Sequence, residues 1–269
     1  MPDVLVDSPR PGVAVVTLNR PHHLNALTAE TTQALFDTFE RLGRDVDCRV
    51  VIVTGAGRGF CAGDDLVDYR PPAWIPAERI GEIHSNMYQQ KHLATLVPRM
   101  RAMPQPVVAA VNGPAAGAGY ALALGADLRL ASTSAVFANG YVKVGASGCE
   151  MGVSWLLQRI VGATRAAELV LTGRRVAAEE AERIGLVLRV VPDDELLGAA
   201  LELADQIVEN TPLGTWMGKA TLWSNLEVPS LEAAIDLEAR TQILALATED
   251  AAEQRRAVGA KRPPDYKLR

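Results

Sequence analysis

Cysteine is scarce in this sequence, and the three that occur, Cys48, Cys61 and Cys149, lie far apart along the chain. They form no Cys-x-x-Cys pair and no Cys/His ligand spacing, which excludes a disulfide framework and the common zinc motifs. We therefore expect no metal site and a reducing, cytoplasmic compartment. The first residues, MPDVLVDSPRPG, lack an apolar core as long as that of a signal peptide, so the mature chain is expected to begin at or near Met1.

Positive charge is also in short supply. The chain has 27 Lys and Arg against 32 Asp and Glu, a formal net charge of -5, and no long basic run. This balance gives no reason to expect a nucleic-acid partner, so an anionic ligand would have to be bound by local groups. The remaining composition, 48% hydrophobic and 22% charged residues, is that of a globular protein, and a length of 269 residues indicates one large domain with an appendage.

One uncharged segment, residues 102–126, is long enough to span a bilayer. Three prolines, an asparagine and four glycines interrupt it. We expect a buried strand, a turn and a short helix there, and no membrane span.

Strand and helix patterns alternate in the first half of the chain, which is the pattern of an α/β fold. Residues 13–18 and 50–54 read as strands, and between them Thr28 can cap a helix that Gly43 can end. Further strands are expected at residues 107–111, 128–131 and 136–138.

Two other regions have a distinct composition. Prolines 71, 72 and 76 predict a surface loop over residues 69–77, a candidate lid. No glycine occurs from Lys219 to Val258, and Ser230 can cap a helix whose apolar residues lie on one face. We expect this helical appendage to cover its own core or a neighbouring subunit.

Two glycine-rich turns each follow a hydrophobic strand, FCAGDDL at residues 60–66 and NGPAAGAG at residues 112–119. Such turns expose backbone N–H groups near the positive end of a helix, where negative oxygen binds. If the two strands are neighbours, one N–H from each turn can hold a single oxygen, as in an oxyanion hole. For either turn alone, glycines that only permit close packing of strand on helix remain the alternative.

With three further segments, these turns resemble the crotonase family, also called the enoyl-CoA hydratase/isomerase family. Five matching segments occur in the family's order and span nearly the whole chain: NRPHHLNAL (19–27), GRGFCAGDDL (57–66), PVVAAVNGPAAGAGYALAL (106–124), GCEMGVSWLLQRIVG (148–162) and LTGRRVAAEEAERIGLV (171–187).

The resemblance implies an α/β fold in which a crotonase-like spiral of ββα units occupies residues 1–200. Residues 201–269 would form a C-terminal helical region that packs in a homotrimer or a dimer of trimers. The implied substrate is an acyl-CoA thioester of fatty acid metabolism, with coenzyme A as part of the substrate and no separate cofactor. By position, the N–H groups of Asp64 and Ala118 would hold the thioester oxygen, with Ala62 and Gly117 beside them in the ligand site.

The sequence departs from the typical hydratase at both glutamates that handle water and proton. By register these positions hold Ala121 and Tyr141. Alanine cannot transfer a proton, and a phenol with an ordinary pKa of about 10 is a reluctant base. Glu150 remains, at a position that resembles an acidic catalytic residue of isomerases in the family. We therefore expect Glu150 to move a proton between carbons, assisted by Tyr141, although a carboxylate that only stabilises a helix N-terminus is the alternative.

Several polar residues are left with open roles. The side chain of Asp64 is expected to be a bystander or to contact coenzyme A, because a charge there would repel the enolate, and Asp65 is expected to cap a following helix. His84 and His92 are expected to be partly exposed helix residues without a catalytic role. Contacts to coenzyme A are possible for a scattered set: His22, His23, Arg58, Lys261 and Arg262.

Rival functions fit the sequence less well. A Rossmann turn needs a glycine where Phe60 stands, and the Gly-x-Ser-x-Gly elbow of serine hydrolases is absent, with residues 152–156 the nearest approach. A non-catalytic acyl-CoA-binding protein of the same fold stays open as an alternative. The presence of Glu150 favours an enzyme.

Overall fold

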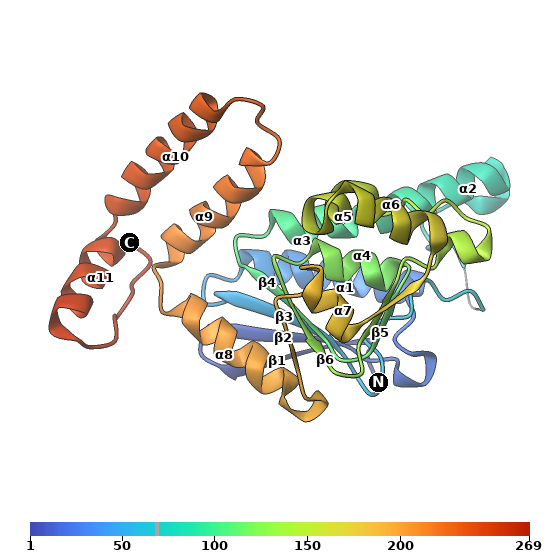
Figure 1. The fold of residues 1–269 in the computed structure, drawn as a ribbon, viewed down its shortest axis with the longest axis horizontal. Helices are drawn as coiled ribbons and strands as arrows, with labels where there is room; N and C mark the ends of the chain where they lie inside the picture. The colour runs from blue at the N-terminus through green and yellow to red at the C-terminus, as the bar shows by residue number, and fades with distance from the viewer. Residues whose placement is uncertain (68–69) are drawn as a thin grey trace.

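Two β-sheets form the centre of the molecule in this computed structural model, which describes residues 1–67 and 70–269 (Figure 1). The larger sheet has the order β1-β2-β3-β4-β6-β9, and all its strands are parallel except β1, which pairs with β2 in the antiparallel sense. Its strands are β1 (Val4–Arg10), β2 (Val13–Leu18), β3 (Val50–Gly55), β4 (Val107–Val111), β6 (Leu128–Ser132) and β9 (Arg189–Val191). The smaller sheet consists of β5 (Pro114–Ala116), β7 (Val136–Ala138) and β8 (Arg175–Ala177).

Helices cover both faces of the larger sheet, which explains why its central strands are continuous runs of apolar residues. Along β4, Val108 and Ala110 face a cluster completed by α8 (Leu196–Val208), whereas the alternate residues face the main core. On the main-core side lie α1 (Ala29–Arg44), α3 (Leu96–Ala102) and α4 (Ala118–Gly125). The α1 helix begins as expected, since Thr28 Oγ1 accepts a hydrogen bond from Thr31 N at 3.1 Å.

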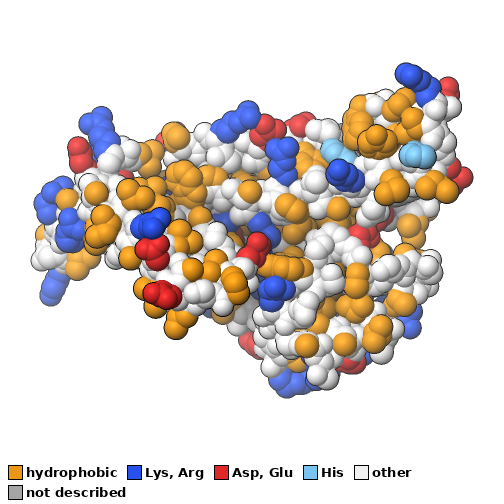
Figure 2. Space-filling view, turned by 90° about the horizontal axis from the view of Figure 1, so that it is seen from above, with side chains coloured by type: hydrophobic (Ala, Val, Ile, Leu, Met, Phe, Trp, Pro, Cys, Tyr) orange, Lys and Arg blue, Asp and Glu red, His pale blue; other side chains and the backbone are white. Residues whose placement is uncertain are grey.

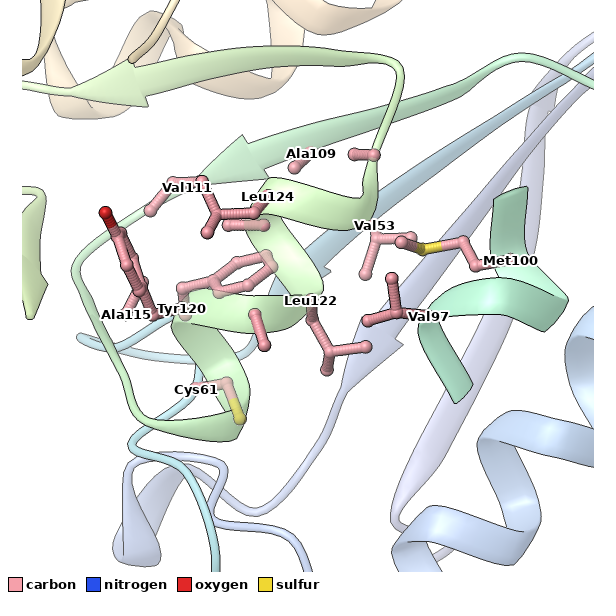
Figure 3. Close-up of a cluster of buried hydrophobic side chains, with 14 of the residues drawn as sticks. Val53, Cys61, Val97, Met100, Ala109, Val111, Ala115, Tyr120, Leu122 and Leu124 are labelled. Atoms are coloured by element: carbon pink, nitrogen blue, oxygen red, sulfur yellow. The ribbon is translucent and has the colours of Figure 1, made fainter. Parts of the chain in front are cut away.

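The α4 helix is buried along its whole length and consists of alanine, glycine, leucine and one tyrosine. Figure 3 shows its Tyr120, Leu122 and Leu124 side chains among residues of β3, β4 and α3. Small residues allow this close approach: a Cβ added to Gly125 would lie 2.7 Å from Met100 Cε. The sheet and α3 therefore hold the start of α4 in a fixed place.

The remaining secondary structure surrounds this core. The α2 helix (Ala77–Ala94) is broken at Gly81, where φ is +72°. The others in this part are η1 (Pro21–His23), η2 (Tyr141–Val144), α5 (Val153–Val161), α6 (Ala163–Thr172), α7 (Ala178–Arg183) and η3 (Asp193–Glu195).

Three C-terminal helices stand away from the sheets, at the left of Figure 1: α9 (Pro212–Asn225), α10 (Leu231–Leu246) and α11 (Glu249–Ala260). Asp127 anchors α9 to the core, because its carboxylate accepts hydrogen bonds from Trp223 Nε1 at 2.5 Å and pairs with Lys219 Nζ at 2.8 Å. No residue of α10 is buried, although the helix carries leucine and isoleucine side chains. Figure 2 shows hydrophobic side chains at the surface at this end of the molecule.

The structure bears out most of the local expectations. The strands lie within one residue of their predicted bounds, and Ser230 caps α10 by accepting a hydrogen bond from Ala233 N at 3.3 Å. No helix within the described ranges 1–67 and 70–269 is long and apolar enough to cross a bilayer. The sequence reasoning did not predict β1, and the domain boundary that it placed after residue 200 falls inside α8, which packs on the sheet.

Two local expectations were wrong. The first helix ends at Arg44, not at Gly43, because Asp45 closes it in an extended conformation and no left-handed glycine is needed. Asp65 does not cap a following helix: the prolines keep the described residues 70–76 free of helix, and the Asp65 carboxylate pairs with Arg20 Nη2 at 2.9 Å. The loop expected over residues 69–77 begins at a position, 69, that lies outside the described residues. Residues 70–76 form no helix or strand, and α2 begins at Ala77.

Candidate active site

The two glycine-rich turns lie side by side because the strands before them are neighbours. β3 and β4 are parallel and pair directly, so both turns leave the same edge of the sheet. Past that edge the chains stay together, since Ala116 N donates to Cys61 O at 2.9 Å and Cys61 N donates to Pro114 O at 3.1 Å. Residues some fifty positions apart in the sequence therefore form one small two-stranded contact.

Glycine is required at this contact for steric reasons. A Cβ added to Gly63, where φ is +97°, would lie 2.9 Å from Ala116 O and 3.3 Å from Ala118 N. A Cβ on Gly119 would overlap the carbonyl oxygen of Cys61. The glycines thus permit the close approach of two backbones, and this approach also brings residue 63 against the amide of Ala118.

Two backbone amides in this contact remain available to a ligand. Ala118 is the first residue of α4, so its N–H has no partner within the helix, and it donates to no other residue in the described part of the chain. Asp64 N also donates to no residue in the described part of the chain. The residues on either side of it do bond to Leu27: Gly63 O accepts from Leu27 N at 2.7 Å, and Asp65 N donates to Leu27 O at 2.9 Å. Both of these amides therefore lie at the contact between the two glycine-rich turns.

The amides of the two flanking residues are already engaged. Ala62 N donates to Leu24 O at 2.9 Å, and Gly117 N donates to Ala138 O at 3.1 Å. The amides of Ala62 and Gly117 therefore stabilise the contact between the turns and are not available to a ligand, unlike those of Asp64 and Ala118.

Tyr141 lies against the second turn. A Cβ on Gly117 would be 3.6 Å from Tyr141 Cε1, so the ring covers the glycine next to Ala118. The Tyr141 hydroxyl is buried near the Glu150 carboxylate, and none of the described residues 1–67 and 70–269 bonds to it at normal hydrogen-bond distance. Burial raises the pKa of this phenol well above its usual value, and the nearby carboxylates of Glu150 and Asp64 add to the shift. The hydroxyl is therefore a donor and not a base.

The carboxyl of Asp64 is close to the same groups. Burial raises its pKa to about 7, and the negative charge of Glu150 contributes. At neutral pH a large share of Asp64 is therefore uncharged. Its N–H and its carboxyl are thus two separate contributions to the site.

Glu150 approaches from a loop before α5. The backbone is left-handed there at Met151 (φ +48°) and Gly152 (φ +88°), and Val153 N at the start of α5 donates to Glu150 O at 2.8 Å. Its carboxylate accepts a hydrogen bond from Gln90 Nε2 on α2. Glu150 is half-buried and faces Asp64 and Tyr141, so the structure brings together three of the four residues expected to act, beside the amide of the fourth, Ala118.

Sequence reasoning missed Gln90, and no local signal could have found it, because its contact with Glu150 spans 60 positions of sequence. His84 is exposed on α2, whereas His92 packs its ring against Phe36 with 4.6 Å between ring centroids. Ala121 is fully buried in α4 and offers no polar group. The basic candidates lie on the surface, where Arg262 pairs with Glu253.

A separate cavity of about 650 Å³ lies between α3, α5 and α9. Its lining reaches Met151 and Gly152, next to Glu150, but does not include Asp64, Ala118 or Tyr141. We place the chemistry at the two turns, because the unpaired amides and the carboxylates are there.

Comparison with known proteins identifies the family of this chain. The sequence model of the Enoyl-CoA hydratase/isomerase family matches residues 9–269. The probable enoyl-CoA hydratase EchA12 of Mycobacterium tuberculosis is 42% identical over 241 residues, which is 89% of this chain and 84% of that protein. The 1,2-epoxyphenylacetyl-CoA isomerase of Escherichia coli is 38% identical over 255 residues, 95% of each chain.

A crystal structure of a probable enoyl-CoA hydratase/isomerase from Mycobacterium abscessus superposes with a TM-score of 0.91 at 37% identity, covering 99% of each chain. The fold is therefore the crotonase fold that the five sequence segments led us to expect. Both hydratases and an isomerase occur among these relatives, so the comparisons identify the family and leave the reaction open. This chain belongs to the enoyl-CoA hydratase/isomerase family.

Proposed function

We propose that the chain binds an acyl-CoA thioester, holds its oxygen with the N–H groups of Asp64 and Ala118, and moves a proton between carbons with Glu150. The observation that carries the proposal is the contact between the two glycine-rich turns, which leaves these two amides free side by side. Removal of a proton beside a thioester puts negative charge on the thioester oxygen. Fixed amide donors stabilise that charge, and loss of one such donor typically costs about 3 to 4 kcal/mol.

The proposed reaction is a double-bond isomerisation. The Glu150 carboxylate accepts a proton from one carbon of the acyl group, the electrons move to the thioester oxygen, and the same proton returns to a second carbon. Gln90 holds the Glu150 carboxylate by its hydrogen bond. This route needs one carboxylate, which suits a site with alanine at 121 and a high-pKa phenol at 141.

The state of Asp64 supports the same proposal. An ionised carboxylate beside the thioester oxygen would oppose the enolate, whereas a protonated one does not. Burial and Glu150 raise the pKa of Asp64 to about 7, so its carboxyl is largely neutral below that pH.

Glu150→Gln tests the proposal directly. Because glutamine cannot accept the proton, turnover should fall by at least about 100-fold, the usual contribution of a general base. Affinity for a saturated acyl-CoA should stay within a few-fold, because the amide donors are untouched. The exposed Glu179→Gln is the matched control and should leave both quantities unchanged. Full turnover in Glu150→Gln would contradict the mechanism.

The substrate panel decides the reaction. The wild-type protein is incubated with 2-enoyl, 3-enoyl and dienoyl thioesters, and the products are analysed by mass spectrometry and ultraviolet absorbance. Isomerisation leaves the mass unchanged and moves the double bond, whereas hydration adds one water. Tight binding without any product would instead identify a non-catalytic acyl-CoA-binding protein.

A further inference from the structure

A small cavity lies between the start of α1, the helix α2 and the first glycine-rich turn. Its volume is about 20 Å³, and a cavity of about 10 to 15 Å³ is enough to hold one water-sized group. Its walls combine apolar groups with the polar residues Thr28, Thr32, Asp64, Arg70, Gln89 and His92. The cavity shares Asp64 with the proposed oxygen site, so the two sites adjoin.

Two of the polar side chains in this wall have a buried atom without a hydrogen-bond partner. Gln89 is 8% exposed, and its Nε2 donates to Arg70 O at 3.4 Å, but its Oε1 accepts nothing. His92 Nε2 is likewise buried and unpaired. An unsatisfied buried polar atom is unfavourable, so both atoms favour a ligand that forms hydrogen bonds.

The ring of His92 is held in place by aromatic contacts. It packs against Phe36, and Trp74 meets it edge-on with 5.4 Å between centroids. Burial lowers the pKa of His92, so the ring is neutral at neutral pH and offers either an N–H or a lone pair at Nε2. A neutral hydrogen-bonding group therefore suits His92 Nε2.

We propose that this cavity binds a single hydroxyl group, which donates to Gln89 Oε1 and pairs with His92 Nε2 beside Asp64. The hydroxyl belongs either to a water molecule or to the acyl group of the thioester, which the Asp64 amide would hold next to the cavity. A hydroxyl has both a donor and an acceptor, which matches one carbonyl oxygen and one imidazole nitrogen. The inference rests on the proposed function only for the choice of thioester ligands.

The test uses two nearly isosteric variants, Gln89→Leu and His92→Phe. Gln89→Leu removes Oε1 together with the Nε2 donor to Arg70 O, and His92→Phe removes both ring nitrogens while phenylalanine keeps the ring packing against Phe36 and Trp74. Asn86→Leu, exposed on the same helix, is the control. Binding of butyryl-CoA and 3-hydroxybutyryl-CoA is measured by calorimetry, and crystal structures of the wild-type and variant proteins are examined at this cavity.

If the acyl group supplies the hydroxyl, the wild type should prefer 3-hydroxybutyryl-CoA by about tenfold, the effect of one or two good hydrogen bonds. Both variants should then lose this preference and bind butyryl-CoA within twofold of wild type. If water supplies it, there is no preference, but an ordered water bridges Gln89 Oε1 and His92 Nε2 in the wild type and is absent from the variants. Neither a preference nor such a water would overturn the proposal. Binding and crystallography do not require turnover, so this result is independent of the Glu150 test.

Discussion

In the proposed function, Asp64 contributes its backbone N–H, while burial and Glu150 raise the pKa of its side chain to about 7. Its amide is one of the two free donors, and main-chain donors tolerate any side chain that does not oppose the charge. The sequence suggested repulsion between Asp64 and an enolate. Burial and Glu150 raise the pKa of the carboxyl to about 7, so this repulsion weakens as the pH falls below that value.

The raised pKa of Asp64 predicts a pH-dependent effect of Asp64→Asn. The folded protein binds more protons at Asp64 than the unfolded chain between the ordinary pKa of 3.8 and about 7, so this contribution to stability is lost as pH rises through that window. Asparagine stays neutral. The Tm of Asp64→Asn relative to wild type should therefore increase from pH 5 to pH 8, as measured by calorimetry.

The control for this prediction is Asp7→Asn, at an exposed position of β1. Its Tm difference from wild type should not change over the same range. A constant Tm difference for Asp64→Asn from pH 5 to pH 8 would show that Asp64 is ionised in the folded protein throughout. In that case the repulsion of the enolate would return as an objection to the proposed function.

At the scale of elements, α2 connects the two carboxylates of the site. Gln90 bonds to Glu150, and one residue earlier Gln89 lines the small cavity beside Asp64. The helix is broken at Gly81, where a side chain would meet nothing within 4 Å, so the break is set by backbone conformation and not by packing. The part of α2 after the break carries both contacts.

Gln90→Leu tests whether α2 positions Glu150. Loss of a hydrogen bond to a charged group costs about 1.5 to 3 kcal/mol, so kcat should fall by about tenfold or more while KM stays within twofold. Gln90→Arg, which retains an N–H donor, should recover part of the loss. Asn86→Leu should behave as wild type, and an unchanged kcat in Gln90→Leu would show that Glu150 needs no support from α2.

At the scale of the whole molecule, α9 to α11 form an extension with an apolar surface. Although α9 packs along α10, Leu231 on α10 is 78% exposed and Ile235 is 53% exposed. Exposed apolar faces of this kind mark contacts between proteins. We propose that the region 201–269 packs against other copies of the chain in a trimer or a dimer of trimers.

Introducing negative charge on the apolar surface of α10 tests this assembly. The double variant Leu231→Asp, Ile235→Asp should shift the protein to a monomer, because burying two carboxylates in an apolar interface is unfavourable. Light scattering after size exclusion gives the mass, and Glu232→Gln on the same helix is the control. A monomeric wild-type protein at micromolar concentration would contradict the proposal.

Much of the fold could be predicted from local sequence patterns. The buried apolar strand β4, the Thr28 and Ser230 caps and the two glycine-rich turns each depend on a few consecutive residues, so they could be predicted. β1 escaped notice because it is an edge strand with exposed polar residues at its end. Asp65 was misjudged because its ionic partner, Arg20, is distant in sequence.

The sequence by itself determined the α/β alternation, the family and the turns that carry the two amides, because spacing along the chain encodes them. Only the tertiary structure decided which side chains meet. Gln90 reaches Glu150 and Gln89 shares a cavity with Asp64 because α2 folds back over the loops, and the neutral state of Asp64 follows from the burial that this packing creates. Contacts between distant residues depend on how helices and loops are placed in space, which no local pattern records.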